Sequence, residues 1–70
     1  MRFTPFARIR LARHGLSADE VQRLVAQSVI AIPVSGGKMV HEGVIGEQMV
    51  SIIVLPGTPP TVVALTARSL

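Results

Sequence analysis

The stretch GLSADEV, residues 15–21, decides how the first half of the chain folds, because it ends one helix and starts the next. Gly15 is the kind of residue found just past a helix C-terminus, where the backbone turns left-handed. Ser17 and Glu20 form a capping box, in which each side chain accepts a hydrogen bond from the backbone N–H of the other residue. We therefore expect one helix to end before this stretch and a second helix to begin within it.

Helical signals continue on both sides of this stretch. Thr4 is a suitable N-cap and Pro5 fits the first helical position, so a helix is expected over residues 5–14. On the other side, apolar residues recur at i, i+3 and i+4 from Val21, with polar residues elsewhere on the helix. This spacing predicts a second helix over residues 18–27 with one apolar side.

The second half of the chain is rich in β-branched residues, which favour strands. Strands are expected over residues 29–34, 38–45, 48–55 and 61–67. Pro33 places the first of them at a sheet edge, because proline donates no backbone hydrogen bond. The expected fold is a single α+β domain, residues 1–70, with two N-terminal helices packed on a small antiparallel sheet of three to four strands.

Residues 48–55 predict a sheet that is apolar on both faces. Successive strand residues point to opposite sides, so one side receives Met49, Ser51, Ile53 and Leu55, and the other receives Val50, Ile52 and Val54. Two helices can cover only one of these faces. We expect a second copy of the chain or another protein on the other face. The alternative is that the helices wrap, or the strands coil, until the core closes within the chain.

Composition excludes several classes of protein. The chain has no cysteine, 49% hydrophobic residues and 16% charged residues, which excludes a disulfide scaffold, a Cys-based zinc module and intrinsic disorder. No apolar stretch approaches the roughly 18 residues of a membrane span. A signal peptide is not expected, since Arg8, Arg10 and Arg13 interrupt the apolar residues near the start. We expect a cytoplasmic protein that does not contact a membrane.

Positive charge is concentrated at the start of the chain. Residues 1–28 contain five arginines and two acids, whereas residues 29–70 contain two basic and two acidic residues. This distribution favours attraction to the phosphates of nucleic acid or to an acidic protein. The alternative is an exposed helix face that only keeps the chain in solution. Phe3 and Phe6 are the only aromatic residues, which argues against a protein that stacks single-stranded bases.

Motifs for enzymatic chemistry are weak when judged from spacing alone. There is no GxGxxG, P-loop, nucleophile elbow or HExxH. His14 and His41 are not spaced as a metal-binding pair, so neither a metal nor another cofactor is expected. His41 and Glu42 are neighbours on an expected strand and point to opposite faces, so they cannot act on one atom together. Either residue alone suits general acid or base chemistry.

A family resemblance extends this interpretation. Residues 6–17, FARIRLARHGLS, and the Asp-Glu-Val at 19–21 resemble the HARxRMxxRGIS-x-EEV opening of a family of small toxin-like domains. Residues 13–17 also resemble the KHGVSFEEA segment of the BrnT ribonuclease toxins, relatives of the RelE and ParE superfamily. The sheet half resembles the same toxins. Lys38 stands where BrnT has a basic residue before a strand, and Gly43, Gly46 and residues 49–54 resemble its IGxxGGRLLLVV segment. Residues 62–68 resemble its RIISAR strand.

The resemblance implies a toxin of a type II toxin–antitoxin system, a metal-independent ribonuclease held inactive by an antitoxin protein. Cleavage of RNA by internal transfer needs a base, an acid and cations that stabilise the charged phosphorane. The implied catalytic residues are Arg10, Lys38, Arg68, His14 and His41, and the implied RNA contacts are Arg8 and Arg13. Phe6 and Gln48 stand where the family patterns have a histidine and an arginine.

Two alternatives to this function stay open. Each arginine can instead be an exposed charge or the partner of Glu42 or Glu47 in an ion pair. The whole chain can instead be a non-catalytic interaction module of the same scaffold, which forms a homodimer through its apolar sheet.

Overall fold

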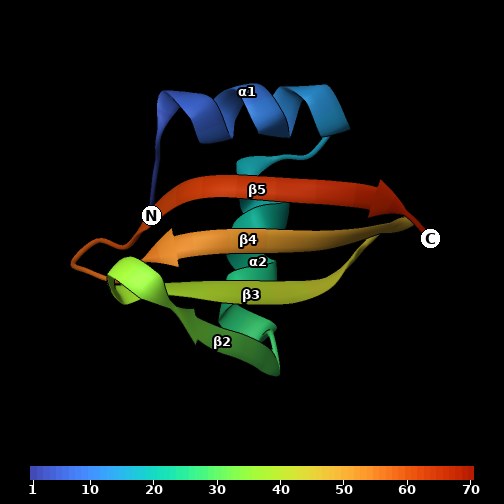
Figure 1. Cartoon of the computed structure of the whole chain (residues 1–70). Helices are drawn as coiled ribbons and strands as arrows, with labels where there is room; N and C mark the ends of the chain where they lie inside the picture. Colours follow the sequence, from blue (N-terminus) through green and yellow to red (C-terminus); the bar gives the residue numbers. More distant parts are fainter.

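The computed structural model describes residues 1–70 as two helices and a five-stranded sheet. In chain order the elements are β1 (Arg2–Phe3), α1 (Pro5–His14), α2 (Ala18–Gln27), β2 (Ile30–Val34), a short 3-10 turn (Ser35–Gly37), β3 (Lys38–Ile45), β4 (Gln48–Leu55) and β5 (Thr61–Ser69). The strands lie side by side in the order β1-β5-β4-β3-β2 (Figure 1). The α+β class and the two N-terminal helices are as predicted.

The sheet differs from the prediction in one respect. It is a mixed sheet of five strands, not an antiparallel sheet of three to four, because residues 2–3 pair in parallel with the start of β5. The N–H of Arg2 donates to the carbonyl of Pro60 at 2.9 Å, and the N–H of Thr4 donates to that of Val62 at 3.0 Å. A strand of two residues is too short to carry an alternating pattern, so the sequence gives no sign of β1.

Both helices begin and end at the predicted residues because their caps form. Thr4 Oγ1 accepts a hydrogen bond from the N–H of Ala7 at 3.1 Å, and Gly15 ends α1 with φ +66°. In the capping box of α2, Ser17 Oγ accepts from the N–H of Glu20 at 3.1 Å. The N–H of Ser17 in turn donates to Glu20 Oε1 at 2.9 Å. These local bonds fix where each helix starts before any packing is considered.

One hydrophobic core lies between the helices and one face of the sheet. Figure 1 shows α2 crossing behind the strands and α1 running beside β5, so that no helix covers the front of the sheet. The core consists of Ala7, Leu11, Leu16, Val21, Leu24, Val50, Ile52, Val54, Val62 and Leu65. A bulge between β4 and β5 explains why Val62 and Leu65, three residues apart, both face the helices. Neither helix has the length and apolar character that a membrane crossing requires.

Candidate interaction surface on the open sheet face

The two faces of strand β4 have similar side chains and different surroundings. Val50 and Ile52 are fully buried against the helices. Ile53 and Leu55, which point the other way, are half-buried and exposed respectively. The predicted division of residues 48–55 between the two faces is therefore confirmed, and the helices cover only one of them.

The uncovered side of the sheet, here called the open face, is largely apolar. Directly paired residues of neighbouring strands share a face, so the register defines its members. These are Ile30, Ile32, Val34, Lys38, Val40, Glu42, Val44, Met49, Ser51, Ile53, Leu55, Thr61, Ala64, Thr66 and Arg68. Its most exposed apolar side chains are Ile30 at 47%, Ile32 at 48%, Val34 at 39%, Val44 at 55% and Leu55 at 41%. The open face thus presents exposed apolar side chains from four strands, with polar and charged side chains among them.

A small polar cluster interrupts this surface and consists of Glu42, Ser51, Thr66 and Arg68. Glu42 on β3, Ser51 on β4 and Thr66 on β5 are paired across the strands in one row. Ser51 Oγ donates to Glu42 Oε2 at 2.9 Å. Together with Arg68 they border a shallow hollow of about 260 Å³, floored in part by Met49. Opposite charges therefore stand on two sides of one hollow in an apolar face.

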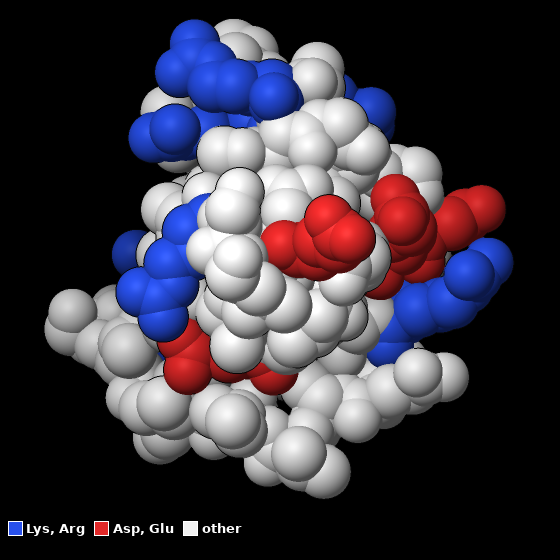
Figure 2. Space-filling model, turned by 90° about the vertical axis from the view of Figure 1, so that its right-hand side faces the viewer, with Lys and Arg blue, Asp and Glu red and all other residues white.

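A second surface of distinct chemistry, here called the basic surface, consists of Arg8, Arg10 and Arg13 on α1 and Arg2 on the neighbouring β1. Figure 2 shows one group of Lys and Arg side chains at the top of the molecule over α1 and further basic side chains at mid-height on both sides, while the end formed by β2 is nearly free of charge. The guanidinium of Arg10 lies 5.2 Å from the centre of the Phe6 ring. That of Arg8 lies 5.8 Å from the Phe3 ring. Such contacts hold the arginine stems against the protein while the charge stays in water.

The implied catalytic residues are spread over the molecule. Arg10 and His14 lie on α1, and His41 lies on the helix-covered side of β3, where its Nδ1 is 2.8 Å from Ser28 Oγ. Lys38 and Arg68 share the open face at its opposite ends. Arg68 is paired through Met49 with Val44 of β3. Val44 lies six positions along β3 from Lys38, which corresponds to about 20 Å. Lys38 and Arg68 are therefore too far apart to act on one phosphate together, and His41 points to the other face of the sheet.

The implied RNA contacts lie on one helix, and Arg68 belongs to the polar cluster of the open face. Arg8 and Arg13 lie with Arg10 on α1. Arg68 and Glu42 border the same hollow, and an ion pair between an arginine and Glu42 is one of the alternatives that the sequence leaves open. The predicted turn at residues 46–47 already pairs Glu42 with Ser51, so the register of the hairpin was the available signal for this part of the polar cluster.

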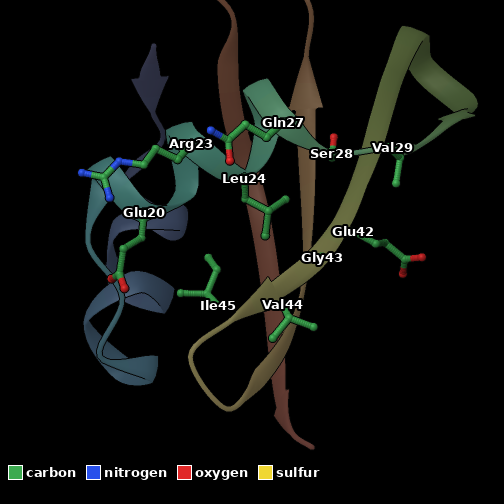
Figure 3. A pocket seen from close by; sticks show the side chains of 10 residues that line it. All are labelled: Glu20, Arg23, Leu24, Gln27, Ser28, Val29, Glu42, Gly43, Val44 and Ile45. Carbon is green, nitrogen blue, oxygen red and sulfur yellow. The ribbon is translucent and has the colours of Figure 1, made fainter.

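A larger hollow of about 430 Å³ lies between α2 and the end of β3 (Figure 3). It exists because β2 pairs with β3 only as far as Glu42, so residues 43–45 pair with β4 but have no strand on their other side. Leu24 packs closely on Gly43, where an added Cβ would lie 3.2 Å from Leu24 Cγ. The side chain of Glu42 points away from α2, toward the other face. This hollow is a gap at the sheet edge without converging charged groups.

No three His, Asp or Glu side chains gather where they could hold a metal ion. The geometry thus offers two surfaces, the open face and the basic surface, rather than an enclosed site. No family model, curated protein or solved structure matches the chain.

Proposed function

We propose that the chain is a non-catalytic protein-interaction module that forms a homodimer through the open face. The observation that carries this proposal is the set of five apolar side chains that stand 39% to 55% exposed on one side of the sheet. Apolar side chains exposed together on one face mark interaction sites, because a partner that covers them removes apolar surface from water, which is favourable.

The size of the open face suits a second copy of the chain. Strands β3 and β4 have eight residues each, which corresponds to a length of about 26 Å. Four strands spaced by about 4.8 Å give a width of roughly 19 Å. The projected area is on the order of 500 Å², which approaches the roughly 600 Å² per partner at the lower end of stable interfaces. A second copy offers an apolar surface of equal size, and a two-fold contact uses the same patch twice.

Contact through the face is favoured over contact through the sheet edge. The edge strand β2 has only five residues and contains Pro33, which has no N–H to donate to a further strand. Its side chains Ile30 and Ile32, in contrast, extend the apolar surface of the open face. Face-to-face packing of two sheets therefore explains more of the exposed apolar area than pairing of two edges would.

The test measures the mass of the protein in solution by sedimentation equilibrium, for the unmodified chain and for Ile32→Lys. The unmodified chain is expected to form a dimer. Ile32→Lys should weaken dimerisation by about 100-fold or more, because each copy loses about 1–2 kcal/mol of apolar contact and must also bury a charge.

The matched control is Ile9→Lys, which changes an isoleucine of similar exposure on α1. It should leave the dimer intact. An unmodified chain that stays monomeric, or a dimer that survives Ile32→Lys and is lost in Ile9→Lys, would contradict the proposal.

A second candidate is an RNA-directed, toxin-like function, and the basic surface favours it. Four arginines lie on or beside α1, and no acid precedes Asp19 in the chain. Such a patch suits contact with phosphates, since arginine donates paired hydrogen bonds to phosphate oxygens. In this function the open face would receive an antitoxin protein instead of a second copy.

The test of the second candidate uses purified protein and a mixed single-stranded RNA in EDTA. Removing the three α1 arginines (Arg8→Ala, Arg10→Ala and Arg13→Ala together) should abolish most binding and lower the salt dependence of log K by about 2. Arg23→Ala, on α2, is the control and should change binding little. Cleavage by the unmodified chain and not by Arg10→Ala/Lys38→Ala/Arg68→Ala would support a ribonuclease. Absence of both binding and cleavage would reject this candidate.

A further inference from the structure

We infer that in the homodimer Glu42 of each copy pairs with Arg68 of the other copy, and that these two pairs set how the open faces meet. This inference rests on the proposed homodimer and specifies its contact. The starting observation is the polar cluster, in which one acid and one base face a shared hollow of about 260 Å³ within an apolar surface.

The carboxylate of Glu42 has unused capacity for hydrogen bonds. Its Oε2 accepts one bond, from Ser51 Oγ, whereas a carboxylate has about four acceptor positions. Arg68 is exposed on β5, one row along the strand from Thr66. Its guanidinium has five donors in a planar fork that fits a carboxylate. The two side chains are therefore chemically matched and geometrically available.

Burial of the open face makes such a pairing necessary. Covering the apolar side chains also takes Glu42 and Arg68 out of water, and a charge buried without a partner costs more than nearby apolar contacts return. An uncharged apolar partner would leave both charges unmatched. A second copy supplies one opposite charge for each of them.

The register allows a two-fold contact to do this. Glu42 lies on β3 and Arg68 on β5, so their midpoint falls on the strand between them, β4, between Ser51 and Met49. A two-fold axis that lies in the interface, passes over this point and runs perpendicular to the line from Glu42 to Arg68 exchanges the two positions. Arg68 of each copy then lies over Glu42 of the other copy, so the interface contains two equivalent pairs. The strands of the two copies cross steeply in this arrangement, as in orthogonal sheet packing.

The test is a charge-reversal experiment with mixing. Glu42→Arg alone and Arg68→Glu alone each place like charges together at both contacts, and each should weaken dimerisation by at least about 100-fold. An equimolar mixture of the two variants places opposite charges at both contacts. It should form a heterodimer within about tenfold of the unmodified affinity. Native mass spectrometry with one variant isotope-labelled identifies the heterodimer.

The controls are Glu47→Arg, in the β3–β4 turn, and Arg23→Glu, on α2, both of which should dimerise like the unmodified chain. Circular dichroism of every variant checks that it is folded. Recovery of a heterodimer from two monomeric variants supports the inference, since pairing within one chain cannot produce it.

Three other outcomes overturn the inference. If the unmodified chain dimerises and neither reversal weakens the dimer, the homodimer stands and the pairing is wrong. If both reversals give monomers and the mixture stays monomeric, the charges do not meet across the interface. If the unmodified chain is itself monomeric, the pairing and the proposed homodimer fail together.

Discussion

The two faces of this sheet are made of the same kinds of residue and end in different surroundings. On the helix-covered face, Val50, Ile52 and Val62 are fully buried. On the open face, Ile32 and Val44 remain about half exposed. The chain therefore contains apolar side chains for two packed layers but helices for only one. This comparison is the reason to place a second copy, rather than solvent, on the open face.

The comparison also separates two roles for an apolar residue in one strand. Side chains of the helix-covered face belong to the core that stabilises the folded chain. Side chains of the open face add little to the stability of one copy and, in the proposed dimer, contribute to association. The predictions below test this separation, beginning with the largest expected effect.

The largest effect is expected from truncation on the helix-covered face. Ile52→Ala should lower the free energy of unfolding by about 3–4 kcal/mol, because it removes a fully buried side chain and leaves a cavity. Ile32→Ala, on the open face, should cost less than about 1 kcal/mol at concentrations where the chain is monomeric. Urea unfolding followed by circular dichroism gives both values. Equal losses for the two variants would show that the faces do not differ in role.

A smaller effect is expected from the helix that covers the core. Ser17→Ala removes the side-chain oxygen that accepts from the N–H of Glu20, and it should lower the free energy of unfolding by about 1 kcal/mol. The dimerisation constant should stay unchanged, because α2 lies on the other side of the sheet from the open face. Thermal unfolding and sedimentation of the same variant test the two statements separately. A weakened dimer in this variant would link the two faces.

The helices were predictable because their signals are local. Thr4, Pro5, Gly15 and the Ser17–Glu20 capping box each act within one turn of backbone, and the helix bounds follow from them. The hairpin around residues 46–47 was predictable for the same reason. Pro33 correctly indicated an edge strand.

The remaining features depend on contacts between distant parts of the chain. Strand β1 forms only because β5, some sixty residues later, provides its hydrogen bonds. The bulge beside Ile53 and Val54 places Leu65 in the core, although strict alternation along β5 would separate it from Val62. For the same reason Arg68 could not be placed at one hollow with Glu42 from the sequence, since this depends on the register of three strands.

The candidate residues implied by the resemblance illustrate the same limit. Spacing placed Arg8, Arg10 and Arg13 on one helix, and they lie there together. Lys38 and His41 point to opposite faces of β3, as alternation along a strand predicts, whereas their position relative to Arg10 on α1 depends on how the helix packs on the sheet.

The most direct test of the account is sedimentation equilibrium of the unmodified chain over a range of micromolar concentrations at physiological salt. The account predicts a reversible equilibrium whose limiting mass is twice that of the chain, with loss of the dimer in Ile32→Lys. A mass equal to one chain at every concentration would contradict it, because the apolar open face would then be stable in water without a second copy.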